Sequence, residues 1–213
     1  MQNQDKKISM IWCDIETTGF TELHKNMVHK HKILEVGLVV TDQHFNVVDK
    51  LSVVISHNRD EAMRWADEYV VNMHTKNGLW DECEKSTLSI KDAEVQLLDF
   101  LVKNGVGRFE SPMWGNSVYL DRAFLEAQMP ELASYFHFRN GDLSAVKEFL
   151  KLISPDFEPI KASGHRALDD ILESINEARL YRSLIKPGLD KILEARAAAP
   201  QMPEDSVDEP HYY

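Results

Sequence analysis

Short apolar runs of strand length come first along the chain. Residues 8–14 form a buried-strand pattern that ends in an acidic residue. Residues 33–41 and 47–55 are rich in Val, Ile and Leu, and β-branched residues favour strands. The polar pentapeptide between them, Asp-Gln-His-Phe-Asn at 42–46, is typical of a hairpin turn. We therefore predict that three antiparallel strands open the fold.

Apolar residues recur at helical spacing further along. Residues 90–103 show this pattern, with Ser89 in the N-cap position. A short strand at 113–114 is predicted to lead through Gly-Asn-Ser into another helix, and two later helices are predicted at 143–153 and 167–184. Strands first, followed by strand and helix in alternation, indicate an α/β fold in which α-helices flank a mixed β-sheet.

The C-terminal part of the chain is predicted to be less regular. Pro187 and Gly188 are predicted to end the last long helix. Residues 189–199 fit one more short helix, and the acidic, proline-containing end of the chain fits a disordered tail. We therefore place a folded domain at residues 1–187 and a short helix with an acidic tail at 188–213.

Composition limits the class of protein. With 213 residues, of which 43% are hydrophobic and 28% charged, the chain fits one globular domain with a full core. The apolar run at 36–40 is much shorter than the ~18 residues of a membrane helix, so no membrane contact is expected. Residues 1–7 show no secretory signal, and two cysteines do not make a disulfide framework. We expect a cytoplasmic protein.

The net charge of −11 limits the partners. Proteins that follow long nucleic acids present basic surfaces, because contacts to phosphate supply most of their affinity. An acidic chain that acts on nucleic acid is therefore expected to hold small pieces, through a few placed cations and metal ions.

A pair of acidic residues in the first strand region indicates a metal site. Asp14 and Glu16 are two residues apart, so a strand directs both side chains to the same face. Two neighbouring carboxylates repel each other unless a cation lies between them, and a divalent metal ion is the usual one. Taken alone, the pair also fits a turn with solvated acids.

Three more polar residues extend this pattern. Asp121 is predicted one turn into a helix, among apolar neighbours, and His165 just before the helix that contains Asp170. A histidine there titrates near neutral pH and can take a proton from an attacking water. Singly, these residues also fit surface acids and a capping histidine. Together, four carboxylates and one base are what two-metal hydrolysis of a phosphodiester requires.

This ordered set resembles the DEDDh group of 3′→5′ exonucleases in the ribonuclease H-like superfamily, and within that group the oligoribonucleases. Residues 14–19, Asp-Ile-Glu-Thr-Thr-Gly, are typical of the whole group. The more specific segments are His-Thr-Lys-Asn-Gly-Leu at 74–79, Gly-Asn-Ser at 115–117, Pro-Glu-Leu at 130–132, Tyr-Phe-His-Phe-Arg at 135–139, Asp-Leu-Ser at 142–144, and His165 with Asp169 and Asp170. The resemblance covers about residues 8–185.

The resemblance implies a ribonuclease H-like fold and two divalent metal ions, Mg²⁺ or Mn²⁺, held by four carboxylates. These are Asp14, Glu16, Asp121 and Asp170. His165 would be the general base, with Asp169 a neighbour that does not bind the metal. The implied activity is 3′→5′ hydrolysis of short single-stranded oligoribonucleotides, down to dinucleotides, to nucleoside 5′-monophosphates. Residues 1–187 would then be the exonuclease domain.

The resemblance also implies a polar cap over the 5′ phosphate of a dinucleotide. Its positions are His74, Ser117, Arg139 and Ser144. Three other substrate positions depart from the family pattern. Phe20 replaces a Leu and Tyr69 replaces a Trp, and both offer an aromatic face for base stacking. Phe138 replaces a Tyr that the partner subunit supplies in the family, so we also expect a homodimer.

Other classes of protein stay open. A related DEDDh enzyme that prefers short DNA or deoxydinucleotides would share the catalytic residues, because the preference for RNA rests on contacts to the 2′-OH. A non-catalytic nucleotide-binding protein is a second alternative, although the intact acids and base argue against it. A general metal-dependent phosphatase is a third, which a test on a phosphodiester would exclude.

Overall fold

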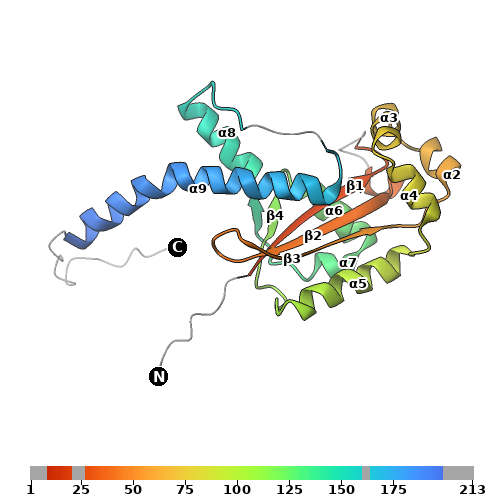
Figure 1. Ribbon diagram of the computed structural model, residues 1–213, viewed down its shortest axis with the longest axis horizontal. Helices are drawn as coiled ribbons and strands as arrows, with labels where there is room; N and C mark the ends of the chain where they lie inside the picture. The colour runs from red at the N-terminus through yellow and green to blue at the C-terminus, as the bar shows by residue number, and fades with distance from the viewer. Residues whose placement is uncertain (1–8, 21–26, 160–163, 199–213) are drawn as a thin grey trace, which may run out of the picture. The chain divides into compact units, whose positions relative to one another are not determined.

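The computed structural model describes residues 9–20, 27–159 and 164–198. Its centre is a five-stranded sheet in the order β3-β2-β1-β4-β5 (Figure 1). The strands are β1 Met10–Thr17, β2 Ile33–Thr41, β3 Val47–Val54, β4 Met113–Gly115 and β5 Asn140–Asp142. β2 pairs antiparallel with both β1 and β3, whereas β4 is parallel to β1 and β5 is parallel to β4. The prediction of a mixed sheet that opens with three antiparallel strands is confirmed.

The alternation of side chains along β1 separates the core from the polar face. Ile11, Cys13 and Ile15 are buried in the main hydrophobic core. Because successive side chains of a strand point to opposite faces, Asp14 and Glu16 point away from that core. The sequence had suggested that these acids lie at the end of the strand. β1 instead continues to Thr17, so both acids lie within it.

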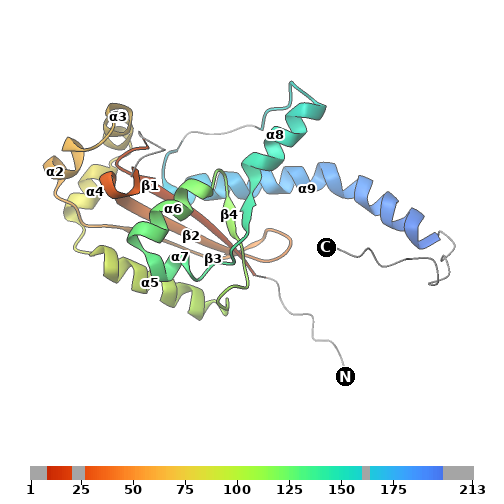
Figure 2. The ribbon, with the colours of Figure 1, turned by 180° about the vertical axis from the view of Figure 1, so that it is seen from behind.

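Helices cover both faces of the sheet. They are α1 Met27–Lys30, α2 Arg59–Arg64, α3 Glu68–Lys76, α4 Leu79–Lys85, α5 Ile90–Lys103, α6 Tyr119–Gln128, α7 Pro130–Ala133, α8 Leu143–Ile153 and α9 Ala167–Ala198. α5, α6 and α7 pack on the core face of the sheet (Figure 2). The predicted cap of α5 is confirmed, because Ser89 Oγ accepts a hydrogen bond from the Asp92 N–H at 3.2 Å.

The opposite face of the sheet is covered by the first turns of α9. The contact is close at Gly37 of β2, where an added Cβ would lie 2.9 Å from Ala167 Cβ and 3.0 Å from Ile171 Cδ1. Gly37 is the register partner of Asp14 on β1. A glycine at this position therefore lets α9 begin directly beside the acidic face of β1.

Several short elements were not predicted from the sequence. They are helix α1, the consecutive helices α2, α3 and α4, helix α7 and strand β5. None exceeds nine residues, and a segment of that length shows too few turns for the helical period to stand out. α2, α3 and α4 pack into a second buried cluster around Leu34, Leu79 and Trp80.

The predicted break of the last helix at Pro187 and Gly188 is wrong. α9 runs from Ala167 to Ala198 with Pro187 inside it. The proline removes an N–H that would bond to the carbonyl of Ser183, and both residues are exposed, so water can satisfy that carbonyl. Met1–Ala178 and Arg179–Tyr213 form two compact units. The domain boundary proposed at residue 187 stays a prediction, and the predicted acidic tail lies outside the described residues.

Within the described part of the chain, no helix combines the length and the apolarity needed to cross a membrane.

Candidate active site

Three of the predicted metal ligands meet on the polar face of the sheet. Asp14 and Glu16 come from β1, and Asp170 comes from the first turn of α9. One ligand oxygen from each of the three residues lies within 4.8 Å of those of the other two. Residues more than 150 positions apart in the sequence are therefore close enough to share a cation.

Asp121 joins this group from the first turn of α6. Its side chain is 7% exposed, and its Oδ1 accepts a hydrogen bond from the Ile15 N–H at 3.0 Å. That bond ties α6 to the part of β1 between Asp14 and Glu16. β1, α6 and α9 thus carry the four predicted ligands, and three of them, Asp14, Glu16 and Asp170, lie within reach of one cation.

Crowding and burial make these acids hard to ionise in the absence of a cation. Burial raises the pKa of Glu16 to about 8, with a further contribution from repulsion by Asp170. Burial also raises the pKa of Asp121 to about 7. The pKa of Asp14 is raised well above its usual range, by burial first and then by repulsion from Asp121 and Glu16. Clustered carboxylate oxygens are the ligands that hard divalent cations prefer, so these residues fit a divalent metal site.

His165 lies just before α9, in a strained backbone conformation. Its φ is +47°, which is uncommon for a residue other than glycine. Its carbonyl accepts a hydrogen bond from Asn77 Nδ2 at 2.6 Å. The imidazole is half-buried and lines a pocket of about 530 Å³ together with Tyr69, Met73 and Asn77. The predicted base and the predicted stacking residue Tyr69 therefore line the same pocket.

His74, a residue of the predicted phosphate cap, lies beside a predicted metal ligand. It is fully buried, and its Nε2 is 3.6 Å from Glu16 Oε2. Among the described residues that Nε2 has no hydrogen-bond partner, and burial lowers the pKa of His74 to about 4. The structure thus places a neutral imidazole directly behind a predicted metal ligand.

The two serines of the predicted cap do meet. Ser117 Oγ and Ser144 Oγ are 3.2 Å apart. Asp142 caps α8 and holds both residues, because its Oδ1 accepts hydrogen bonds from the Ser117 N–H at 3.0 Å and the Ser144 N–H at 2.9 Å. Asn116 extends the network, since its Oδ1 accepts a hydrogen bond from Ser144 Oγ at 3.1 Å and its Nδ2 donates one to Ser174 of α9 at 2.9 Å.

The sequence of the chain follows the pattern of the family described as Exonuclease over residues 11–178. The oligoribonuclease of Chromobacterium violaceum is 38% identical over 176 residues, which are 82% of this chain and 93% of that protein. The oligoribonuclease of Pseudomonas syringae pv. tomato is 40% identical over 188 residues, which are 88% of this chain and 100% of that protein.

The chain belongs to the oligoribonuclease family of exonucleases.

Solved structures agree with this family at the level of the fold. The zinc-bound complex of Escherichia coli exonuclease I with single-stranded DNA superposes with a TM-score of 0.64 at 14% identity, over 89% of this chain. The present chain covers 43% of the length of that exonuclease I chain. Pop2p of Schizosaccharomyces pombe, in its Mg²⁺- and Mn²⁺-bound form, superposes with a TM-score of 0.58 at 18% identity over 82% of each chain.

The first of the predicted aromatic positions lies beside a tight turn at the end of β1. Phe20 is 36% exposed and packs edge-on against Phe124 of α6, with 6.4 Å between ring centroids. Its N–H donates to Asp67 Oδ2 at 2.8 Å. The preceding residue has to be Gly19, because its φ is +156° and an added Cβ would lie 2.3 Å from that carboxylate oxygen. The turn at Gly19 thus leaves Phe20 partly exposed at the surface.

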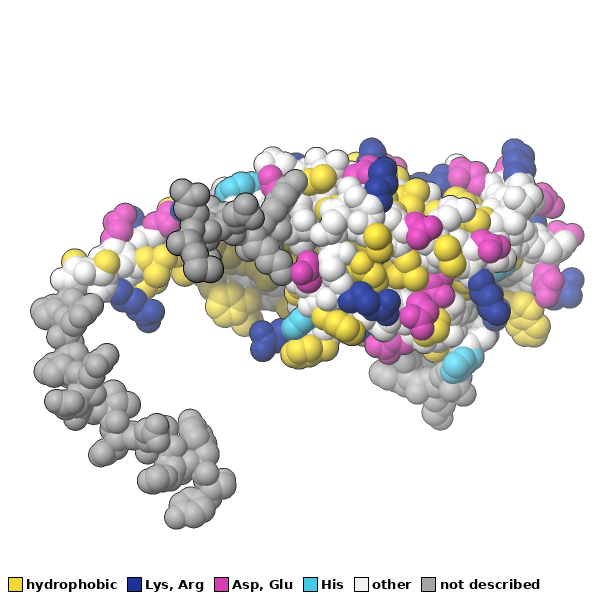
Figure 3. All heavy atoms as spheres, turned by 90° about the horizontal axis from the view of Figure 1, so that it is seen from below, with side chains coloured by type: hydrophobic (Ala, Val, Ile, Leu, Met, Phe, Trp, Pro, Cys, Tyr) yellow, Lys and Arg dark blue, Asp and Glu magenta, His cyan; other side chains and the backbone are white. Residues whose placement is uncertain are grey.

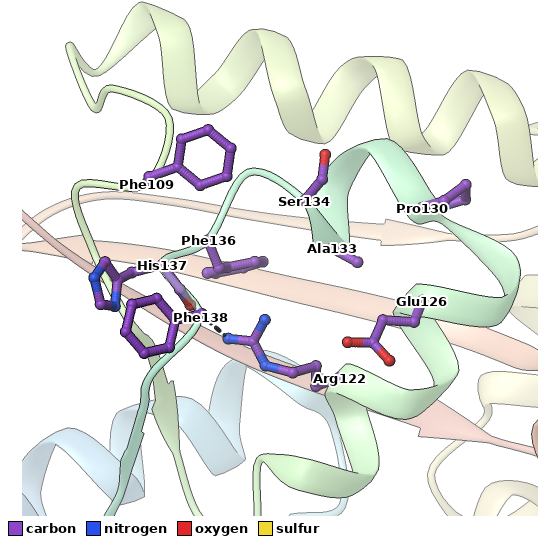
Figure 4. A pocket seen from close by; sticks show the side chains of 9 residues that line it. All are labelled: Phe109, Arg122, Glu126, Pro130, Ala133, Ser134, Phe136, His137 and Phe138. Carbon is purple, nitrogen blue, oxygen red and sulfur yellow. Dashed lines mark hydrogen bonds between the residues drawn. The ribbon is translucent and has the colours of Figure 1, made fainter. Parts of the chain in front are cut away.

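The segment between α7 and β5 carries the other two predicted substrate residues, Phe138 and Arg139. Phe138 is 77% exposed, and the Arg139 guanidinium lies 5.5 Å from the centroid of its ring. Phe138 also lines an open pocket of about 550 Å³ on this chain, where Arg122 Nη2 donates to the His137 carbonyl at 2.9 Å (Figure 4). Among the described residues, neither Phe138 nor Arg139 forms a hydrogen bond with Ser117 or Ser144.

One residue at the site was missed by the sequence analysis. Glu35 of β2 is 2% exposed and is the register partner of Glu16. Its charge raises the pKa values of Glu16 and Asp14. A single acid inside the otherwise apolar strand Ile33–Thr41 was the signal that could have identified it, because a buried carboxylate requires a partner.

Proposed function

We propose that this protein is a 3′→5′ exoribonuclease that hydrolyses short oligoribonucleotides, down to dinucleotides, to nucleoside 5′-monophosphates. The observation that carries the proposal is the convergence of Asp14, Glu16 and Asp170, with Asp121 bonded to the same strand, in a chain that is 38–40% identical to oligoribonucleases over most of its length. Three of the carboxylates that the sequence pattern selects, Asp14, Glu16 and Asp170, have ligand oxygens close enough to share a cation, which supports the proposal.

The four carboxylates would hold two divalent cations, Mg²⁺ or Mn²⁺. When bound, such ions stabilise the charge on the attacking and leaving oxygens of the phosphodiester. Asp14, Glu16 and Asp170 surround one position at which ligand oxygens converge. Asp121 adds a fourth carboxylate, oriented by the hydrogen bond from the Ile15 N–H.

His165 is the general base of this proposal. It lies just before α9, its carbonyl accepts a hydrogen bond from Asn77, and it lines the same pocket as Tyr69, which supports this role. The ring takes a proton from the attacking water and gives it up to solvent, as a general base does.

Short substrates fit the polar residues of the site and the charge of the molecule. Ser117 and Ser144 offer paired hydroxyls to a 5′ phosphate, with Arg139 and His74 as the further cap residues taken from the family pattern. Phe20 and Tyr69 present aromatic faces for two bases. On the face seen in Figure 3, described Lys and Arg side chains are scattered among Asp and Glu, which suits a pocket for small fragments better than a track for long ones.

We further propose a homodimer and a cytoplasmic location. The exposed Phe138, beside an open apolar pocket, is a side chain that a second copy of the chain would cover. A monomeric mass in sedimentation at enzyme-active concentrations would contradict the dimer. Cys13 and Cys83 are both free and buried, as expected for thiols in a reducing compartment.

The test is a set of time courses with 5′-labelled RNA and DNA of two to seven nucleotides, in Mg²⁺ or Mn²⁺. We expect metal-dependent release of mononucleotides, with RNA dinucleotides consumed fastest. Faster turnover of deoxydinucleotides would move the proposal to the DNA-preferring alternative. Binding without turnover of any substrate would support a non-catalytic nucleotide-binding protein.

A further inference from the structure

The segment that leads into α9 supplies two of the proposed catalytic side chains, His165 and Asp170. His165 is held in a left-handed conformation with φ of +47°. A non-glycine residue keeps such a conformation only where its surroundings fix it. On one side, Asn77 binds the His165 carbonyl at 2.6 Å.

On the other side, Arg166 bridges carboxylates from two different elements. Its Nε and Nη2 donate to Glu35 of β2 at 2.9 and 3.2 Å. Its Nη1 and Nη2 donate to Glu82 of α4, both at 2.8 Å. The planar fork of a guanidinium fixes direction as well as distance when it is bound at two carboxylates. Arg166 therefore joins the start of α9 to β2 and α4 at once.

Glu35 links the same contacts to the metal ligands. It lies opposite Glu16 in the register of β1 and β2. Its Oε2 also accepts a hydrogen bond from the N–H of Ala167, the first residue of α9, at 3.4 Å. Glu35 thus ties Arg166 and the first residue of α9 to β2, the strand that pairs with the one that carries Glu16.

We propose that Arg166, clamped between Glu35 and Glu82, is a positioning residue that holds His165 and Asp170 over the carboxylates of β1. It touches no substrate in this role and acts through the backbone on either side of it. The inference rests on the proposed function, because it assigns the clamp to the alignment of that catalytic site.

The test removes the exposed end of the clamp and compares it with a matched neighbour on the same helix. Glu82→Ala breaks two of the four bonds of Arg166 and leaves the buried Glu35 pair in place. Asp81→Ala is the control, since Asp81 binds Arg59 and does not bind Arg166. A small misplacement of catalytic groups costs up to ~10²-fold in rate. We therefore expect Glu82→Ala to lower kcat about 10-fold with KM changed less than about 2-fold, and Asp81→Ala to change neither by more than about 2-fold.

A second readout does not depend on turnover. Amide hydrogen exchange at residues 167–172 should become about 10-fold faster in Glu82→Ala and stay unchanged in Asp81→Ala, because opening of this first turn becomes easier. Arg166→Lys keeps the charge but loses the planar fork that binds each carboxylate at two points, so it should lower kcat at least as much as Glu82→Ala.

The outcomes separate the two proposals. A wild-type protein that hydrolyses no dinucleotide defeats the proposed function, and the exchange comparison still decides whether the clamp fixes α9. Equal kcat and equal exchange in Glu82→Ala and Asp81→Ala would overturn the clamp, and so would faster exchange in Glu82→Ala with an unchanged kcat. Wild-type kcat in Arg166→Lys would overturn it as well.

Discussion

At the scale of single residues, the metal-free site should make the protein sensitive to alkaline pH. The pKa values of Glu16, about 8, and Asp121, about 7, lie above those of the unfolded chain. Folding therefore favours their protonated forms, and this stability is present below about pH 4 and is lost as the pH rises through 7 to 8. Each tenfold penalty on ionisation costs about 1.4 kcal/mol, or about 3–6 °C in Tm for a chain of this size.

The measurement is thermal unfolding in EDTA and in Mg²⁺, at pH 5 and at pH 8.5. We predict a Tm lower by at least about 3 °C at pH 8.5 in EDTA, recovered by Mg²⁺ at pH 8.5 and little changed by it at pH 5. The variant Glu16→Gln should show a flatter dependence on pH. Equal Tm at the two pH values in EDTA, for the wild type, would mean that the acids are not crowded as described.

His165 should affect the chemical step more than binding. Removal of a general base typically costs ~10²–10⁴-fold in rate, and a base acts on a proton that moves in the transition state. We predict that His165→Asn lowers kcat in that range and leaves KM nearly unchanged. His44→Asn, in the turn between β2 and β3, is the control and should leave both constants as in the wild type. A variant that keeps kcat and loses affinity would make His165 a binding residue.

The residue types of the candidate site were predictable, but their contacts were not. The sequence predicted Asp14, Glu16, Asp121, Asp170 and His165 from their positions on a strand and at the starts of two helices, and from the resemblance to the DEDDh exonucleases. The location of His74 depends on how α3 packs behind β1, which no local pattern encodes. The ion pair of Arg166 with Glu35 joins residues 131 positions apart, and only the packing of α9 on β2 reveals it.

At the scale of elements, the approach of α9 to the sheet should depend on Gly37. An added Cβ would lie 2.9 Å from Ala167 Cβ and 3.1 Å from its backbone, so α9 or β2 would have to shift. We predict that Gly37→Ala lowers kcat about 10-fold or more, because the shift moves Asp170 relative to Asp14.

The matched control for this substitution is Gly188→Ala, where an added Cβ meets nothing within 4 Å. It should leave turnover unchanged. Circular dichroism and Tm would check that Gly37→Ala remains folded. Full activity of a folded Gly37→Ala would show that α9 tolerates displacement and that the alignment of its first turn is not critical.

The elements that the sequence predicted are those with a long hydrophobic pattern or a clear cap or turn residue at an end. β2, α5 and α8 lie where they were expected, since their runs of nine to fourteen residues show a clear pattern. The helices of six to nine residues between β3 and α5 were missed, because their stability comes from packing on Leu34 and not from their own sequence. Pro187 was predicted to end the helix. An exposed helix can continue past a proline, because water can bond to the carbonyl that loses its partner.

At the scale of the whole molecule, the preference for short substrates should depend on Arg139. The acidic chain has few cations that could bind a long strand. Loss of one charge-assisted contact at a terminal phosphate should therefore weaken binding of the shortest substrate most. Such a contact contributes roughly 1.5–3 kcal/mol, or about one to two decades in affinity. We predict that Arg139→Ala weakens dinucleotide binding by that amount and binding of seven nucleotides much less.

Binding and turnover of both lengths would be compared with those of Arg108→Ala. Arg108 is another exposed arginine, which pairs with Glu131 and Ser134, and its loss should leave the length preference intact. Equal losses of affinity for both substrate lengths in Arg139→Ala would show that Arg139 is a general phosphate contact and that the proposed phosphate cap is wrong.

The most direct test of a two-metal 3′→5′ exoribonuclease is the product pattern of a 5′-labelled RNA heptamer, in wild type and in Asp121→Asn. Asp121→Asn keeps the size of the side chain and an acceptor for the Ile15 N–H, but removes one of the four carboxylates. We predict that the wild type shortens the labelled strand one nucleotide at a time to a labelled mononucleotide, only with Mg²⁺ or Mn²⁺, and that the folded variant leaves it intact. Immediate release of labelled mononucleotide, undiminished activity in EDTA, or wild-type turnover by Asp121→Asn would each contradict the assignment.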